Sequence, residues 1–377
     1  MGRDAPPLFA RLPPQYFTQI LRVAAEARAK PGPRFIDLGR GNPDLPPPPR
    51  ALQALRDADY HGYAPFQGEP ELREAICARY AADHGVELDP DREVAVIPGT
   101  KTGIMFAALA AARRDDTILL PDPGYPDYLS GVALTNARMA PLPLDERAGF
   151  QPDFDAVAGE RPALVMLNYP SNPCSVCEHE GTFERAVAYA RERDSWLVHD
   201  LAYGFLAFDG RRARSILEVD RERSAELWSP SKVYGMAGWR IGFLVGAAEL
   251  VARVRDLVDH TTAGVYAGIQ RGLTAALTGD QADVAERRAV YERRRDRLAA
   301  ALEGLAVPEG TFYAWWRLPE GVSVAGLVEE ARVGLAPGEG FGARGAGWAR
   351  LSLAVPDEDV DEAADRLAGV LATSSGT

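Results

Sequence analysis

The sequence predicts an α/β protein with a mostly parallel sheet in a large domain and a smaller α+β domain. Apolar runs alternate with helical patterns as far as residue 245, which is typical of parallel strands buried on both faces. Beyond residue 245 the pattern changes to long helices and then to a mixed α+β stretch. The length of 377 residues also favours two domains, because such a chain is too long for one small core.

The first half of the chain carries candidate strands, each an apolar run bounded by turn residues. These runs span residues 94–97, 117–120, 163–167, 196–199, 226–229 and 241–245. Helical periodicity between them predicts helices at residues 103–112, 126–134 and 180–192. Because parallel strands need crossover connections of this kind, the alternation predicts the sheet.

The second half is mostly helical. Helices are expected at residues 248–259, 265–277, 281–305, 324–333 and 358–371, with strands at 311–317 and 348–354. Near the amino end, residues 16–28 form an amphipathic pattern. The Pro-rich segment 44–50 is expected to be extended, as a rigid connector rather than a ligand for a partner domain.

These elements predict a division of the chain into three parts. Residues 1–45 form an N-terminal arm and part of the small domain, residues 46–275 form the large domain, and residues 276–377 complete the small one. The large domain contains all the candidate strands of the parallel sheet.

Composition excludes several classes of function. The formal net charge of −12 argues against binding to nucleic acid, which needs a basic face. Apolar runs such as residues 104–112 fall far short of the roughly 20 residues that cross a bilayer, and no signal peptide is recognisable. We therefore expect a cytoplasmic protein without a membrane partner.

The cysteines do not predict a metal site. Cys174 and Cys177 form a CxxC pair, but neither a second pair nor a matching pair of histidines accompanies them. Cys77 falls in an amphipathic pattern and is expected to be a small core residue. The role of the CxxC pair stays open.

Residues 229–246 read SPSKVYGMAGWRIGFLVG and carry a lysine in a Ser- and Gly-rich turn. Lys232 offers an amine that can form a Schiff base, while the Ser229 hydroxyl and the Arg240 guanidinium can hold a phosphate. Arg240 is expected on the strand that continues to residue 245. A lone lysine in a loop is more often an ordinary surface residue, so the functional interpretation depends on the other segments.

A second candidate for anion binding is the turn PGTKTG at residues 98–103, which follows the first strand and opens a helix. A glycine-bounded turn at a helix N-terminus presents free backbone N–H groups to an anion. Gly99 starts this turn, and Thr100 and Lys101 add side-chain donors. Many strand–helix turns look similar, so this signal is weak by itself.

Further segments that follow candidate strands suit a flat, charged ligand. PDPGYPDY holds Tyr125 between prolines, and NYPSNP carries Asn172. HDLAY carries Asp200 and Tyr203 directly after another strand. Each also has a structural interpretation: a half-buried tyrosine, an asparagine serving its own turn, and an aspartate capping a helix.

In this order, the segments resemble those of fold-type I pyridoxal-phosphate enzymes, the aspartate aminotransferase superfamily. The resemblance covers residues 36–371 and is specific for class I and II aminotransferases. Within this class, the segments are most similar to those of prokaryotic LL-diaminopimelate and alanine- or aspartate-type enzymes. It implies pyridoxal 5′-phosphate as the cofactor and a seven-stranded, mostly parallel sheet in the large domain.

The resemblance implies roles for these residues. Lys232 would hold the cofactor and transfer the proton, while Asp200 would pair with the pyridine nitrogen. Tyr125 would cover the ring, and Asn172 and Tyr203 would bond to its phenolic oxygen. The phosphate would be held by Gly99, Thr100, Lys101, Ser229 and Arg240.

Three more residues carry implied roles in substrate binding and assembly. Arg350, in the segment GWARLSL, would bind the carboxylate of an amino acid, with Asn172 and with Gly41 of GRGNPD on the substrate side. Tyr63, in GYAPFQG, matches a tyrosine that reaches the phosphate of the neighbouring subunit. A homodimer with its active sites at the interface is therefore expected.

Two departures from the family pattern leave the substrate open. Thr102 stands where the LL-diaminopimelate enzymes often have glutamate, and Cys174-Ser175 replaces the usual Thr-Gly after the asparagine turn. Neither change touches Lys232 or Asn172. The amino donor, the oxo-acid acceptor and the pathway are not predicted.

The favoured function is the transfer of an amino group from an L-amino acid to a 2-oxo acid. The same lysine, aspartate and arginine would serve a lyase, cyclase or decarboxylase, so this alternative stays open. A regulatory protein built on the same domain would need a DNA-binding segment, for which the acidic chain has no spare N-terminal domain.

Overall fold

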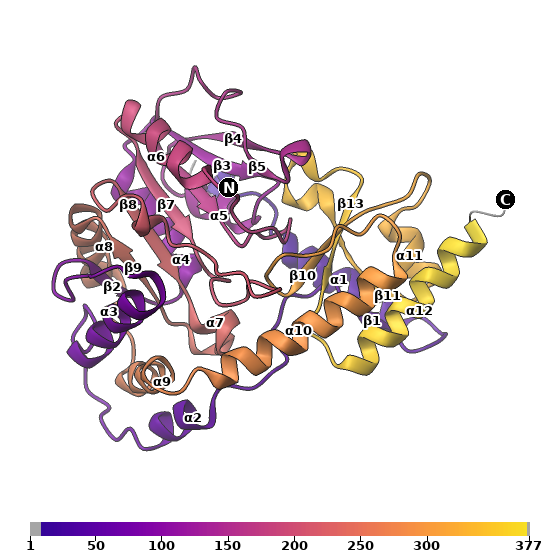
Figure 1. Ribbon diagram of the computed structural model, residues 1–377, viewed down its shortest axis with the longest axis horizontal. Coiled ribbons are helices and arrows are strands. Elements are labelled where there is room, and N and C mark those ends of the chain that lie inside the picture. Colours follow the sequence, from indigo (N-terminus) through magenta and orange to yellow (C-terminus); the bar gives the residue numbers. More distant parts are fainter. Residues whose placement is uncertain (1–8, 375–377) are drawn as a thin grey trace, which may run out of the picture.

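A mostly parallel sheet forms the centre of the larger lobe of the molecule (Figure 1). The computed structural model describes residues 9–374. In spatial order the strands are β2 (Val94–Ile97), β9 (Gly242–Gly246), β8 (Ser224–Trp228), β7 (Trp196–Asp200), β6 (Pro162–Asn168), β3 (Thr117–Asp122), β4 (Arg138–Asp145) and β5 (Gln151–Pro152). Strands β8, β7, β6, β3 and β4 are parallel, whereas β9 is antiparallel to both of its neighbours.

The sheet confirms the predicted class and corrects two details. Its eight strands are one more than expected, because the two-residue β5 pairs antiparallel with β4 at the edge. Strand β4 is missing from the predicted runs, since Pro141 and Pro143 interrupt its pattern. Proline is tolerated at this place near the sheet edge, where fewer backbone N–H groups have to donate to a neighbouring strand.

Helices cover both faces of this sheet, as the continuous apolar strands predicted. Val94 and Val96 of β2 join the core with helices α3 (Pro70–His84) and α6 (Thr182–Glu192). Ala95 and Ile97 face the opposite core with α4 (Thr100–Ala111), α5 (Asp127–Ala133) and α8 (Ala248–Thr261). Helices α2 (Pro49–Arg56) and α9 (Ala267–Thr278) pack against each other on the α3 side.

The smaller lobe combines the C-terminal elements with the start of the chain (Figure 1). Its three-stranded sheet has β13 (Trp348–Ser352) between β10 (Tyr313–Arg317) and β12 (Ala336–Pro337), and β1 (Ile36–Asp37) pairs with β11 (Val333–Gly334). Its helices are α1 (Tyr16–Ala29), α10 (Ala282–Ala301), α11 (Val324–Glu330) and α12 (Asp357–Ser374). Short helices complete the described chain: η1 (Phe9–Arg11), η2 (Glu146–Ala148), η3 (Ile216–Glu218), α7 (Pro230–Val233), η4 (Ala237–Trp239), η5 (Gly338–Phe341) and η6 (Ala343–Gly345).

The Pro-rich connector is extended only as far as Pro48, because α2 begins at Pro49. The expectation that all of residues 44–50 are extended was therefore wrong at its end, since proline at the first helical position loses no hydrogen bond. Arg287 of α10 donates to the carbonyls of Leu45 and Pro46 at 3.1 and 2.7 Å. These bonds hold the extended part against the smaller lobe.

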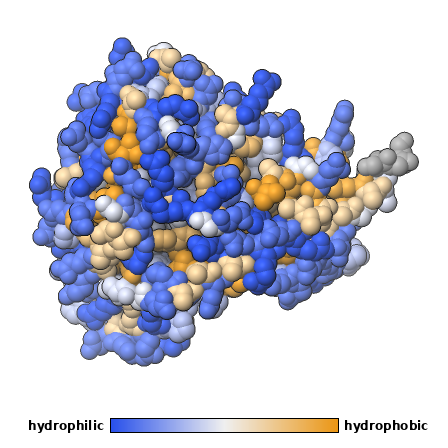
Figure 2. All heavy atoms as spheres, in the orientation of Figure 1, coloured by the Kyte–Doolittle hydropathy of each residue, from blue (hydrophilic) through white to orange (hydrophobic). Residues whose placement is uncertain are grey.

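Polar residues cover much of the face seen in Figure 2. Tyr60, Tyr63, Phe66 and Tyr266 form an exposed aromatic patch, in which Tyr60 bonds to the Tyr63 carbonyl and the Tyr266 ring stacks on His61. Tyr63 is 82% exposed, and its ring meets that of Phe66 edge-on. Within residues 9–374, no helix is both long enough and apolar enough to cross a membrane.

Candidate active site

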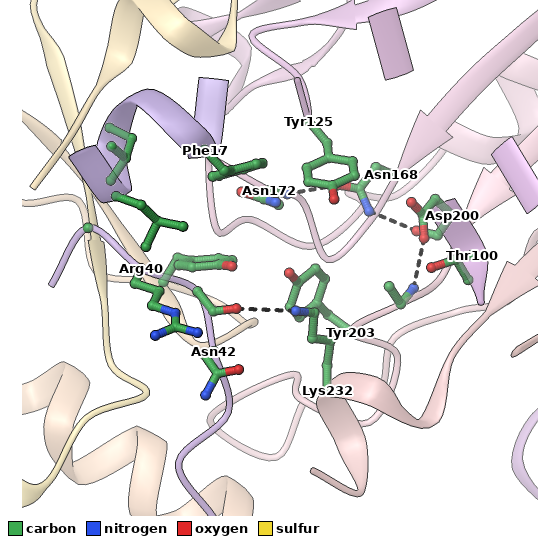
Figure 3. A pocket seen from close by; sticks show the side chains of 16 residues that line it. Phe17, Arg40, Asn42, Thr100, Tyr125, Asn168, Asn172, Asp200, Tyr203 and Lys232 are labelled. Carbon is green, nitrogen blue, oxygen red and sulfur yellow. Dashed lines mark hydrogen bonds between the residues drawn. The ribbon is translucent and has the colours of Figure 1, made fainter. Parts of the chain in front are cut away.

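A cavity of about 240 Å³ lies where the carboxyl ends of the parallel strands meet segments of the smaller lobe (Figure 3). Asn168 ends β6 and Asp200 ends β7, and both line the cavity. Ligands of open α/β sheets bind outside the carboxyl ends of strands, because side chains from adjacent loops converge there. Of the predicted residues, the cavity brings together Gly41, Thr100, Tyr125, Asn172, Asp200, Tyr203 and Lys232.

Lys232 lies in the short helix α7 rather than in an open turn. Pro230 begins this helix, and the Ser229 hydroxyl caps it by accepting a bond from the Ser231 N–H at 3.1 Å. The Lys232 amine points into the cavity and donates to the Gly41 carbonyl at 3.4 Å (Figure 3). Burial is the main cause that lowers the pKa of this amine. A larger share of neutral amine makes Lys232 a better nucleophile and base.

The other lysines of the sequence are engaged in ion pairs. The chain has three lysines. Lys30 pairs with Glu329 at 3.2 Å, and Lys101 pairs with the buried Asp127 at 3.0 Å. Lys101, which was expected to add a phosphate donor, therefore directs its amine to Asp127. Its backbone N–H still lies in the first turn of α4.

Asp200 is held by bonds at both of its carboxylate oxygens. Tyr128 donates its hydroxyl to one oxygen at 2.8 Å, and the Ala202 N–H donates to the other at 3.1 Å. Asn168 donates to the Asp200 backbone carbonyl at 2.8 Å. Burial raises the pKa of the Asp200 carboxyl, while the two bonds and the Lys232 charge oppose the rise. A cation placed against this carboxylate would stabilise its ionised form.

Tyr125 forms one wall of the cavity and is fixed by a buried carboxylate. Its hydroxyl donates to Asp127 at 2.6 Å, and the Gln15 amide donates to the other oxygen of Asp127 at 2.6 Å. The ring of Phe17, from α1, lies 5.9 Å from the Tyr125 ring. The N-terminal helix and the tyrosine that faces the cavity are thus connected through Asp127.

The predicted phosphate site is assembled around the first turn of α4. Gly99 precedes this helix with a φ of 86°, and no side chain caps the free N–H groups. A Cβ on Gly99 would lie 2.5 Å from Nη2 of Arg240, so the guanidinium lies directly against the glycine. Arg240 precedes β9, with a φ of 54°, rather than lying on the strand as expected. An uncapped helix terminus beside a guanidinium fits a phosphate group.

Arg350 lies immediately behind the cavity wall and is fully buried. Its guanidinium donates to the Asn172 side-chain oxygen at 2.9 Å and to the Gly39 carbonyl at 3.3 Å. Its Nε has no hydrogen-bond partner among the described residues. An unpaired buried donor costs about 1–3 kcal/mol, which a bound carboxylate would recover.

Tyr313 was not predicted from the sequence, and it connects the lysine with the arginine. The Arg350 guanidinium lies 3.9 Å above its ring. A Cβ on Gly41 would lie 1.8 Å from its hydroxyl, so the phenol fills the space beside this glycine. Burial raises the pKa of Tyr313, but Arg350, Lys232 and a hydrogen bond with Tyr203 outweigh it and lower the pKa.

Sequence reasoning also gave no role to Tyr128, Asn168 and Phe17. A signal existed for the first two, since Tyr128 ends the PGYPDY motif and Asn168 begins NYPSNP. Phe17 and Tyr313 lie in no recognisable sequence motif. Their position beside the cavity depends on packing between distant segments, which a local pattern does not show. Tyr63 is not brought to the cavity within a single chain; it belongs to the exposed aromatic patch.

The turn after Asn172 keeps, at Ser175, a backbone conformation that suits the glycine of the family pattern. Ser175 has a φ of 60°, in the left-handed region where glycine is favoured, and it is fully buried.

Cys174 and Cys177 are free, and burial raises the pKa of both thiols, which disfavours thiolate chemistry. Among residues 9–374, no cluster of histidine, cysteine and acidic side chains could hold a metal ion.

A family model described as aminotransferase class I and II matches residues 33–367. The chain belongs to this family. The match spans both lobes, and it includes Lys232, Asp200 and Arg350. These class I and II aminotransferases use pyridoxal phosphate, and the chain is an aminotransferase that moves amino groups between amino acids and oxo acids.

Individual aminotransferases support the assignment. The chain is 38% identical to transaminase BacF of Bacillus subtilis, over 94% of each protein. It is 37% identical to an LL-diaminopimelate aminotransferase of Dehalococcoides mccartyi, over 95% of this chain and 96% of that protein. A substrate-bound structure of Bacillus BacF superposes with a TM-score of 0.92 at 35% identity, covering 98% of each chain.

These relatives confirm the sequence-based resemblance, including its similarity to LL-diaminopimelate aminotransferases, and they confirm fold type I. They do not favour the lyase, cyclase or decarboxylase alternative, because transaminases and aminotransferases match over nearly the full chain.

Proposed function

We propose that this aminotransferase uses pyridoxal 5′-phosphate, bound at Lys232, to transfer the amino group of an L-amino acid to a 2-oxo acid. The observation that carries the proposal is the convergence of Lys232, Asp200 and Tyr125 on one cavity beside an uncapped helix end. A lysine amine, a buried carboxylate and an aromatic wall are what the cofactor requires of a protein.

Each part of the cofactor has candidate partners in the chain. Asp200 would pair with the ring nitrogen, Tyr125 would cover the ring, and Asn172 and Tyr203 would donate to the phenolic oxygen. The phosphate would be held by Gly99, Thr100, Lys101, Ser229 and Arg240. When bound, pyridoxal phosphate supplies a carbonyl that binds amines and a ring that withdraws electrons from the Cα–H bond.

The residues around the substrate divide the remaining tasks. The Lys232 Nζ accepts the proton from Cα as a general base and later donates it as an acid, which its lowered pKa favours. Arg350 holds the substrate carboxylate, with Asn172 and Gly41 on the same side. Fixing both the carboxylate and the amine sets the direction of the Cα–H bond relative to Lys232.

A half-reaction tests this function directly. The protein loaded with pyridoxal phosphate is mixed with one L-amino acid at a time, without an oxo-acid acceptor. A transaminase is expected to release about one oxo acid per site and then stop, because the amino group remains on the cofactor. Continuous release of carbon dioxide or of a side-chain fragment, measured by mass spectrometry, would contradict the proposal.

The aromatic patch supports a homodimer whose subunits share their active sites. Among the large hydrophobic side chains of the described residues, that of Tyr63 is the most exposed. The patch offers apolar surface on which a second copy of the chain could pack. In the dimer, Tyr63 would donate to the phosphate in the neighbouring subunit.

The cytoplasmic location and the domain boundaries at residues 45 and 275 stay predictions.

Tyr63→Phe tests this sharing of sites. The variant is expected to stay dimeric in light scattering, because it keeps the ring. Its affinity for pyridoxal phosphate should fall about 10- to 100-fold, since a hydrogen bond to a charged phosphate is lost. Tyr266→Phe removes another hydroxyl from the same patch and should leave the affinity unchanged. A monomeric wild-type protein, or equal effects of both substitutions, would argue against shared sites.

A further inference from the structure

A second cationic side chain, Arg40, lies on the wall of the cavity and takes no part in the function proposed above (Figure 3). It stands between Gly39, whose carbonyl accepts from Arg350, and Gly41, whose carbonyl accepts from Lys232. The backbone at Arg40 therefore runs between the two carbonyls that bind Arg350 and Lys232, the groups proposed to hold the substrate.

Arg40 has no ion-pair partner within the described part of the chain. Three carboxylates line a neighbouring hollow that Arg40 also borders, and each of them already has an arginine partner. The pairs are Asp37 with Arg28 at 2.7 Å, Asp44 with Arg294 at 2.9 Å, and Asp359 with Arg34 at 2.6 Å. Arg40 forms neither an ion pair nor a side-chain hydrogen bond with residues 9–374.

The rest of the nearby wall suits a short apolar chain that ends in a charged group. Phe17, Ile20 and Leu21 of α1 line the cavity with apolar side chains. Asn42 lies on the wall close in sequence to Arg40 and presents an exposed amide. An apolar wall would contact methylene groups of a substrate, and a guanidinium fork matches the two oxygens of a carboxylate.

We propose that Arg40 forms a subsite for the side-chain carboxylate of dicarboxylic amino acids and oxo acids. This inference rests on the proposed function, in which Arg350 takes the α-carboxylate and Lys232 meets the amino group. It assigns one substrate class of the enzyme to acidic compounds of the size of glutamate.

Binding of unreactive acids tests the subsite separately from catalysis. Calorimetric titration of the cofactor-loaded protein compares glutarate, which has two carboxylates, with pentanoate, which has the same carbon count and one carboxylate. Wild type is expected to prefer glutarate at least tenfold, because only glutarate meets both arginines. Arg40→Gln should abolish this preference while pentanoate binds unchanged, and Arg40→Lys should keep part of it.

A matched control removes the same charge elsewhere. Arg114 is exposed between α4 and β3, at the opposite edge of the sheet, and Arg114→Gln should keep the wild-type preference. Because Arg40 is exposed, neither variant at this position should lower the melting temperature. In steady-state kinetics, Arg40→Gln should raise the KM for glutamate and Arg40→Lys should raise it less, whereas Arg114→Gln should not change it. The KM for glutamine should stay the same in all three variants.

Two results separate failure of the subsite from failure of the proposed function. A glutarate preference that is absent in wild type, or that stays within twofold after Arg40→Gln, would overturn the Arg40 subsite alone. Unchanged pentanoate affinity after Arg350→Lys would instead overturn the assignment of Arg350 to the α-carboxylate, on which both proposals depend.

Discussion

Replacing Lys232 by alanine is expected to lower kcat by at least about 10⁴-fold. The variant loses both the amine that holds the cofactor and the base that moves the Cα proton, and general acid–base catalysis alone contributes 10²–10⁴-fold. The substitution should leave the fold intact, because Lys232 is only partly buried and its amine makes just one hydrogen bond to residues 9–374, a long one to the Gly41 carbonyl. The measurement is single-turnover kinetics with a saturating amino acid.

The small number of lysines makes the attachment site testable by mass. Borohydride reduction of the loaded wild-type protein should add one cofactor to the peptide that contains Lys232, whereas Lys232→Ala should add none. Lys101→Ala is the matched control, since it removes the other lysine near the cavity but should retain the mass change. Labelling at Lys101, or normal turnover by Lys232→Ala, would contradict the assignment.

Replacing Arg350 by lysine is expected to raise the KM for amino acids about 10²- to 10³-fold. Lysine keeps the charge but loses the planar fork, and disrupting a buried, hydrogen-bonded charge pair typically costs 2–5 kcal/mol. The effect should fall on KM more than on kcat, because Arg350 does not move protons. Steady-state kinetics with the best amino donor separates the two constants.

Because Arg350 is fully buried, its substitution needs a control for folding. Arg317 lies on β10, the strand paired with β13, and its side chain is exposed and ion-paired with Glu146. Arg317→Gln should leave both KM and melting temperature close to wild type. If Arg350→Lys retains the wild-type KM while it remains folded, the α-carboxylate is bound elsewhere.

The sequence predicted the cofactor side of the site better than the substrate side. Asp200 and Asn172 follow apolar strands, and parallel strands bring their carboxyl ends to one edge whatever the details of packing. Residues of that kind can be placed from local patterns alone. The six candidate strands were confirmed for the same reason, with shifts of one or two residues at their ends.

The substrate side depends on distances that no local pattern encodes. Tyr313 reaches Arg350 because β10 and β13 pair antiparallel, with Trp315 opposite Arg350. Phe17 lies beside the cavity because Gln15 is bound to Asp127, more than a hundred residues away. Arg240 was misplaced because its backbone is left-handed, so that the strand begins only at Gly242. Such contacts arise from the register and docking of remote segments.

The order of residues around the cavity has a consequence for synthesis on the ribosome. The proposed cofactor contacts within one chain lie between Gly99 and Arg240, so a nascent chain possesses them before its last third is made. Arg350 and Tyr313 emerge later, and the segment that leads to Arg40 must wait for β11 and β13, because Ile36 and Asp37 pair with β11 and Gly39 accepts from Arg350. A nascent chain can therefore assemble its cofactor pocket before it can select a substrate.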